Sequence, residues 1–232
     1  MSWKIFGVVL IFLFQTHSLR AQVDKIQKIS FVLKYGNLPL KLDTHYALGN
    51  GDSIEINTLK FYISELQFFK NDTIVFKEPN SYHLVDAAEE NSKQIQFSIP
   101  SVTAFHTIRF NLGIDSITNF SGALGGELDP TKGMYWTWQN GYINFKMEGK
   151  CNSIANPNKE FQFHLGGYQY PYNSLQTVVL NVSGSEQLFI VMDIEKLISG
   201  IDLSYQNQIM SPGKEAMILS EKIYKIFSIS KY

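Results

Sequence analysis

The sequence predicts an all-β fold, mainly an antiparallel β-sandwich, with a short C-terminal helix. Short runs rich in β-branched and aromatic residues recur about every ten residues along the chain. Turns built from polar residues, Gly, Pro or Asn separate most of these runs. Only one extended segment places apolar residues at helical spacing. This combination indicates packed sheets with little helix.

The strands follow in order along the chain. The first is predicted at 28–33, and the second at 58–69 alternates with Leu59, Phe61 and Ile63 in phase before the pattern slips at Leu66. Further short strands are predicted at 73–76, 82–85, 94–99, 106–112, 141–147, 160–165, 175–182 and 187–193.

Two segments depart from the strand pattern. Residues 194–198 are predicted to form a short helix that ends before Gly200. A Ser-Pro-Gly signal at 211–213 precedes the clearest helix, predicted over 214–227. Its apolar residues form one stripe that we expect to pack on the core: Ala216, Leu219, Ile223 and Phe227.

The segment 115–132 has little periodicity and several glycines, and it leads into an aromatic stretch, GMYWTWQNGY, at 133–142. A loop of this length in a compact domain is uncommon unless it has a function. If the Trp-x-Trp lies in a strand, Trp136 and Trp138 share one face. Core packing, an exposed binding platform and a redox-active site all remain open for these indoles.

Residues 1–21 have the layout of a secretory signal peptide. Lys4 precedes an apolar run of ten residues at 5–14, and a polar exit ends before Gln22, where cleavage is expected. The alternative is an uncleaved N-terminal anchor, which usually needs a longer apolar run. No later segment is apolar for long enough to span a bilayer. We therefore expect a periplasmic or secreted protein with a single β-rich domain at 22–232.

The charge balance argues against nucleic acid as a partner. The sequence has 20 basic and 21 acidic residues, and no two Lys or Arg residues are adjacent. Cys151 is the only cysteine, so no internal disulfide can form and stability must come from the core. A buried, unreactive thiol is the simplest interpretation of Cys151.

The sequence lacks the common catalytic motifs, including the nucleophile elbow, the P-loop and the zinc-protease helix. The acidic pairs Glu127/Asp129 and Glu89/Glu90 lie in predicted loops, where solvated charge is the better interpretation. We therefore predict a protein that is not an enzyme.

His164 is the most promising metal ligand. In FQFHLGG, at 161–167, Phe161, Phe163 and Leu165 share one face, so His164 points from the other. His83, Met134 and Met210 are further candidates, because imidazole with thioether and no thiolate pair favours copper over structural zinc. A surface histidine with ordinary partners and gap-filling methionines are the alternatives.

The aromatic stretch and its surroundings, residues 121–149, resemble the signature of the MbnP-like copper-binding family of exported bacterial proteins. The FQFHLGG segment, KFYIS at 60–64, YHLVD at 82–86 and IMSPG at 209–213 also look like that family. The order and spacing of these segments cover nearly all of the chain after 1–21, and their style is similar to Bacteroidetes-type members.

The resemblance implies a periplasmic or secreted copper-binding domain. It also implies a di-haem, peroxidase-like partner of the MbnH type, which oxidises a Trp of some members to kynurenine. Trp136 or Trp138 would be the modified residue, and His164 a copper ligand. The better-studied members carry four cysteines, whereas this chain has only Cys151, and it has no His beside Met210.

Besides copper acquisition or trafficking, two other functions remain open. The first is a carbohydrate- or peptide-binding module, in which Trp136, Trp138 and the tyrosines of the segment 168–172 form a stacking platform. Exposed, coplanar indoles would favour it, and burial of both would count against it. The second is a hydrolase, for which no nucleophile and base are suitably spaced.

Overall fold

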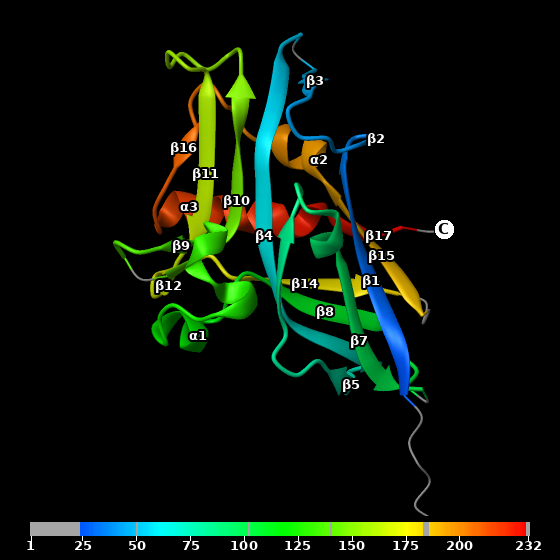
Figure 1. Cartoon of the computed structure of the whole chain (residues 1–232). Helices are drawn as coiled ribbons and strands as arrows, with labels where there is room; N and C mark the ends of the chain where they lie inside the picture. Colours follow the sequence, from blue (N-terminus) through cyan, green and yellow to red (C-terminus); the bar gives the residue numbers. More distant parts are fainter. Residues whose placement is uncertain (1–23, 50, 102, 140, 183–185, 231–232) are drawn as a thin grey trace, which may run out of the picture.

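A computed structural model describes residues 24–49, 51–101, 103–139, 141–182 and 186–230 (Figure 1). The predicted signal peptide at 1–21 therefore lies outside the described residues. The predicted fold class is confirmed, because strands dominate and most of them pair antiparallel. The strands are β1 Asp24–Tyr35, β2 Leu38–Pro39, β3 His45–Ala47, β4 Ser53–Lys70, β5 Thr73–Lys77, β6 Tyr82–Asp86, β7 Gln94–Pro100, β8 Thr107–Leu112, β9 Tyr135–Trp136, β10 Gly141–Cys151, β11 Glu160–Gly166, β12 Tyr168–Gln169, β13 Tyr172–Asn173, β14 Gln176–Asn181, β15 Gln187–Asp193, β16 Gln208–Ile209 and β17 Phe227–Ile229. The helices are α1 Ser116–Phe120, α2 Ile194–Ile198 and α3 Lys214–Ile223, with short 3₁₀ turns at Glu90–Lys93, Gly126–Leu128, Pro130–Lys132 and Tyr224–Ile226.

The larger sheet has the strand order β14-β8-β4-β10-β11-β16. The long strand β4 is the centre of this sheet. Strand β10 pairs with its first half and β8 with its second half. The short strands β3, β6 and β5 also pair with β4. The short strand β9 pairs with the start of β10. Only β16 runs parallel to its neighbour β11 in this sheet.

The smaller sheet has the order β17-β15-β1-β2, and β7 also pairs with β1. Strand β1 lies parallel to β15, with Lys28 opposite Gln187 and Lys34 opposite Asp193. The first described strand is thus held by one of the last, and Figure 1 shows the two running side by side.

The two main sheets enclose one large core. Phe31 of β1 packs edge-to-face on Phe61 of β4 and Phe110 of β8, with ring centroids 5.9 and 6.2 Å apart. Such aromatic pairs add to the stability that apolar burial provides. A second, smaller cluster contains Tyr62, Leu84, Ile114, Leu128, Met134, Trp136, Tyr142 and Ile143. Tyr62 lies between the core residues Phe61 and Ile63, so this cluster covers the opposite face of the larger sheet.

The C-terminal helix is shorter than predicted. Helix α3 ends at Ile223, a 3₁₀ turn follows, and Phe227 begins strand β17. Phe227 pairs with Met192 of β15. Its backbone therefore forms hydrogen bonds with the edge of the smaller sheet instead of continuing the helix. The predicted apolar stripe is confirmed as core, because Ala216, Leu219, Ile223 and Phe227 are all buried.

The condition that the Trp-x-Trp pair lies in one strand is not met. Strand β9 contains only Tyr135 and Trp136, and Trp138 lies in the turn that follows. Strand alternation therefore does not apply to the Trp-x-Trp pair. The preceding segment is also more ordered than expected, since Asp115 caps α1 by accepting a hydrogen bond from the Thr118 amide. Among the described residues, no helix is long and apolar enough to cross a membrane.

Candidate functional site

His164 lies near the end of β11, between β10 on one side and β16 on the other (Figure 1). Phe163 and Leu165 belong to the large core. His164 therefore projects from the opposite face, as the period of two predicts. Its side chain is not exposed there, because the residue retains only 7% of its accessible surface.

A carboxylate on the neighbouring strand fixes the imidazole ring. His164 Nε2 lies 2.6 Å from Glu148 Oε1, and the Lys146 ammonium lies 3.5 Å from the same oxygen. Because an ionised carboxylate only accepts, Nε2 carries the proton that it donates. Nδ1 then has a free lone pair, and no hydrogen bond reaches it from the residues that the structure describes.

The protonation of this pair suits metal binding. Burial lowers the pKa of His164 below its usual value, and the charge of Lys146 lowers it further, against the raising effect of Glu148. The pKa of Glu148 is also lowered, because the hydrogen bond from His164 and the charge of Lys146 outweigh its burial. A neutral imidazole beside an ionised carboxylate is therefore the resting state at neutral pH.

Met210 follows directly after β16, the strand next to β11. Strand β16 runs parallel to β11 with Gln208 opposite Gln162 and Ile209 opposite Phe163. Strand β16 ends at Ile209, and Met210 is the next residue, one position beyond the last paired residue. Ile209 belongs to the large core, whereas Met210 is 41% exposed.

Trp136 packs at the same end of β11, on the last residue of the strand. A Cβ added to Gly166 would lie 2.6 Å from Trp136 Cζ3 and 2.9 Å from Cη2, so the indole rests directly on the glycine backbone. Gly166 and His164 are two residues apart on one strand face, which separates them by about 7 Å. Trp136 is 6% exposed. The sequence expectation that at least one indole packs into a cluster thus holds for Trp136.

Trp138 is placed differently. It is 66% exposed, and its ring centroid lies 6.1 Å from that of Trp136 with an interplanar angle of 54°. One indole is buried and the other is exposed, and the two are not coplanar. The pair therefore forms a short aromatic path from the surface to the buried cluster.

His83 and Met134 do not share the site of His164. His83 pairs with Ile63 of β4, so strands β10 and β4 separate it from β11. Its Nε2 lies 2.8 Å from Glu78 Oε2. Met134 is fully buried in the cluster that contains Trp136, two residues before it in the chain. Met134 there behaves as a gap-filling core residue.

No three side chains of His, Cys, Asp or Glu are grouped as a metal site within the part of the chain that the structure describes. A site at His164 would need donors of another type, such as the thioether of Met210 in the segment that follows β16. Sequence reasoning missed Glu148. Glu148 belongs to the family-like stretch 121–149, but the sequence does not show that its side chain reaches His164. That contact depends on the register of β10 and β11.

A shallow aromatic cavity lies beside Trp136. Its volume is 190 Å³, and it is lined by Trp136, Gln139, Gly141, Gly167, Tyr168, Gln169, Tyr170, Tyr172 and Pro212. Tyr170 is almost fully exposed and Tyr172 partly so. Trp136 lines this cavity, whereas His164, Glu148 and Met210 do not.

Comparison with known proteins identifies a family and a solved structure of similar fold. The family model described as MbnP matches residues 24–211. The solved structure of MbnP from Methylosinus trichosporium is similar, with a TM-score of 0.60 and 14% identity, over 78% of this chain and 80% of that one. No protein of curated function matches. The family match covers every residue of the His164 site, and the chain belongs to the MbnP family.

Proposed function

We propose that this protein is an exported copper-binding protein, periplasmic or secreted, that acquires copper or passes it on and is not an enzyme. The observation that carries the proposal is the Glu148–His164 pair, which leaves Nδ1 free on the strand next to β16, after which Met210 follows. A metal-binding histidine commonly donates its second ring N–H to a carboxylate in this way.

The neighbouring groups favour copper over other metals. A neutral imidazole and a thioether are soft or borderline ligands, which suit copper and do not suit magnesium or calcium. The Lys146 ammonium is paired with Glu148, so its charge is partly neutralised. Structural zinc would require a closed set of four ligands, usually with thiolates, and the one cysteine of the chain, Cys151, lies at the far end of β10.

Trp136 is the better candidate for oxidation to kynurenine, because its ring lies over Gly166 next to His164. The modified side chain would then offer an amine and a carbonyl near Nδ1. The proposed oxidant is a di-haem, peroxidase-like partner of the MbnH type. The exposed Trp138 ring, 6.1 Å from Trp136, supports an electron path from such a partner at the surface.

The test is copper content and intact mass of the mature protein purified from its native host. We expect one copper per chain and a mass gain equal to conversion of one Trp to kynurenine, mapped to Trp136. His164→Gln should abolish tight copper binding. His45→Gln is the matched control, because His45 is exposed on β3 and bound only to Glu55.

Two results would contradict the proposal. One is a protein that remains metal-free after copper loading and dialysis. The other is equal copper affinity in the wild type and in His164→Gln. A modification found at Trp138 and absent from Trp136 would reject the assignment of Trp136 while leaving the copper proposal intact.

A second candidate function is a carbohydrate- or peptide-binding module. The exposed rings of Trp138, Tyr170 and Tyr172 around the aromatic cavity favour it. The burial of Trp136 and the 54° angle between the indoles weaken it, because a flat stacking platform needs coplanar, accessible rings. Binding of oligosaccharides that is lost in Trp138→Ala, with copper affinity unchanged, would favour this alternative.

A further inference from the structure

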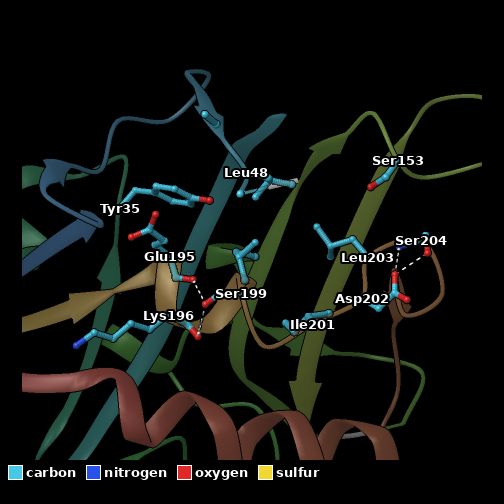
Figure 2. Close-up of a pocket in the computed structure, with 13 residues that line it drawn as sticks. Tyr35, Leu48, Ser153, Glu195, Lys196, Ser199, Ile201, Asp202, Leu203 and Ser204 are labelled. Carbon is cyan, nitrogen blue, oxygen red and sulfur yellow. Dashed lines mark hydrogen bonds between the residues drawn. The ribbon is translucent and has the colours of Figure 1, made fainter. Parts of the chain in front are cut away.

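A large cavity lies away from the His164 site. It has a volume of 620 Å³ and sits between the end of β1, the loop after β3 and the segment from α2 to residue 204 (Figure 2). Its apolar lining comes from Leu48, Ile198, Ile201 and Leu203. A cavity of this size with aliphatic walls can hold an organic molecule.

One hydroxyl in this cavity has no partner. Tyr35 is 5% exposed, and no hydrogen bond to its hydroxyl occurs among the described residues. Figure 2 shows the hydroxyl pointing toward Leu48. Its ring stacks on Tyr46 at 4.4 Å, which holds it in place. The hydroxyl is therefore available to donate to, or accept from, a molecule in the cavity.

The other hydroxyls of the cavity already have partners. Ser199 Oγ donates to the Glu195 carbonyl at 2.8 Å, Ser204 Oγ donates to Asp202, and Ser153 Oγ lies 3.1 Å from Cys151 Sγ. Tyr35 is thus the hydroxyl left to meet a bound molecule. Burial, first of all, and then the charge of Glu195 raise the pKa of Tyr35 to about 12, so it stays protonated.

The charge of the cavity is negative. The Glu195 carboxylate forms no ion pair among the described residues, and it lies against Gly36, where an added Cβ would be 2.5 Å from Oε2. Asp202 is kept ionised, since hydrogen bonds from Ser204 lower its pKa. Lys196 also lines the cavity, but Figure 2 shows its side chain directed away from the centre.

We propose that this cavity binds a small organic amine, with its apolar body against Leu48, Ile198, Ile201 and Leu203 and its ammonium near the Tyr35 hydroxyl and the Glu195 carboxylate. An ammonium donates hydrogen bonds that both oxygens accept. A bare metal ion fits poorly, because aliphatic side chains make up much of the lining and the described residues contain no metal-ligand group there.

The cavity is independent of the candidate copper site. Strand β10 begins at Gly141, beside Trp136, and ends at Cys151, two residues before the cavity residue Ser153. Ten residue steps of a strand span about 33 Å. Occupation of the cavity therefore requires neither copper nor a modified tryptophan.

The test compares two probes by calorimetry on the mature protein. Phenylbutylamine carries an ammonium on an apolar body, and phenylbutanol replaces the ammonium with a neutral hydroxyl. We expect the amine to bind at least tenfold more tightly. Glu195→Gln should weaken amine binding about tenfold, and Tyr35→Phe, which removes only the hydroxyl, should weaken it about fivefold.

Glu90→Gln is the control, because it removes the same charge as Glu195→Gln at an exposed residue that pairs only with Lys93. It should leave amine binding unchanged. Equal affinity for the two probes, no binding of the amine, or unchanged amine affinity in Glu195→Gln would overturn the proposal. Thermal melts of each variant identify any loss of folding, and copper affinity should be the same in all of them.

Discussion

Gly166→Ala tests whether the Trp136 ring packs directly on Gly166 of β11. In the structure, a Cβ at Gly166 would lie 2.6 Å from Trp136 Cζ3 and 2.6 Å from the Tyr142 carbonyl oxygen. Ordinary contacts between such atoms are about 3.5–4.0 Å, so both neighbours lie about 1 Å too close. The carbonyl belongs to β10 next to the Ile143–Gly166 pair and cannot move freely. The Trp136 ring must therefore shift.

Overpacking of this kind typically costs about 1–3 kcal/mol of unfolding free energy. For a domain of this size, each kcal/mol lowers Tm by about 2–4 °C, so we expect a loss of about 2–12 °C. The displaced indole also gains contact with water. The magnitude depends on how far the smaller cluster around Tyr142 can relax.

The assay is thermal unfolding by circular dichroism, together with tryptophan emission of the mature protein. Gly166→Ala should lower Tm and shift the emission to longer wavelength. Gly125→Ala is the matched control, because no atom lies within 4 Å of its added Cβ and its φ is −95°. An unchanged Tm and emission in Gly166→Ala would refute the placement of the ring on the glycine.

Three further predictions concern the residues around His164 and the buried thiol. Glu148→Gln should weaken copper binding about 10–100-fold, because the imidazole loses its orienting carboxylate; an unchanged affinity in a chelator competition would argue against this. The copper-free protein should lose unfolding free energy as the pH falls through 6.5, because the unfolded chain protonates His164 before the folded chain does. Urea titrations at several pH values should show a smaller loss in His164→Gln, and an equal loss would place the effect elsewhere. Cys151 is 1% exposed, so it should react with a thiol reagent only on unfolding; rapid labelling of the native protein would contradict its burial.

Much of the fold could be predicted because its strands carry local signals. The alternation of Leu59, Phe61 and Ile63 continues into a single long strand, and all three residues are buried in the large core. The end of α3 could not be predicted, since Phe227 fits both a helical stripe and a strand. Its partner Met192 decides between them, and that pairing is not a local property.

The candidate site was only partly accessible from sequence. The period of two placed His164 away from the Phe face, and the structure agrees. The pairing of His164 with Glu148 depends on the register of two strands, which no local pattern sets. The separation of Trp136 from Trp138 depends on the turn at 137–140, where the expected strand ends. His83 resembled a ligand in sequence, yet its place across β4 became visible only in three dimensions.

The parallel pairing of β1 with β15 has a consequence for how the chain folds. Gln27 donates a hydrogen bond to the carbonyl of Glu186, 159 residues away in sequence, and the adjoining strands keep this separation along their length. The smaller sheet therefore cannot close until nearly the whole polypeptide is available. Contacts between such distant residues slow folding. The smaller sheet therefore stays open during synthesis until residues 187–193 have left the ribosome.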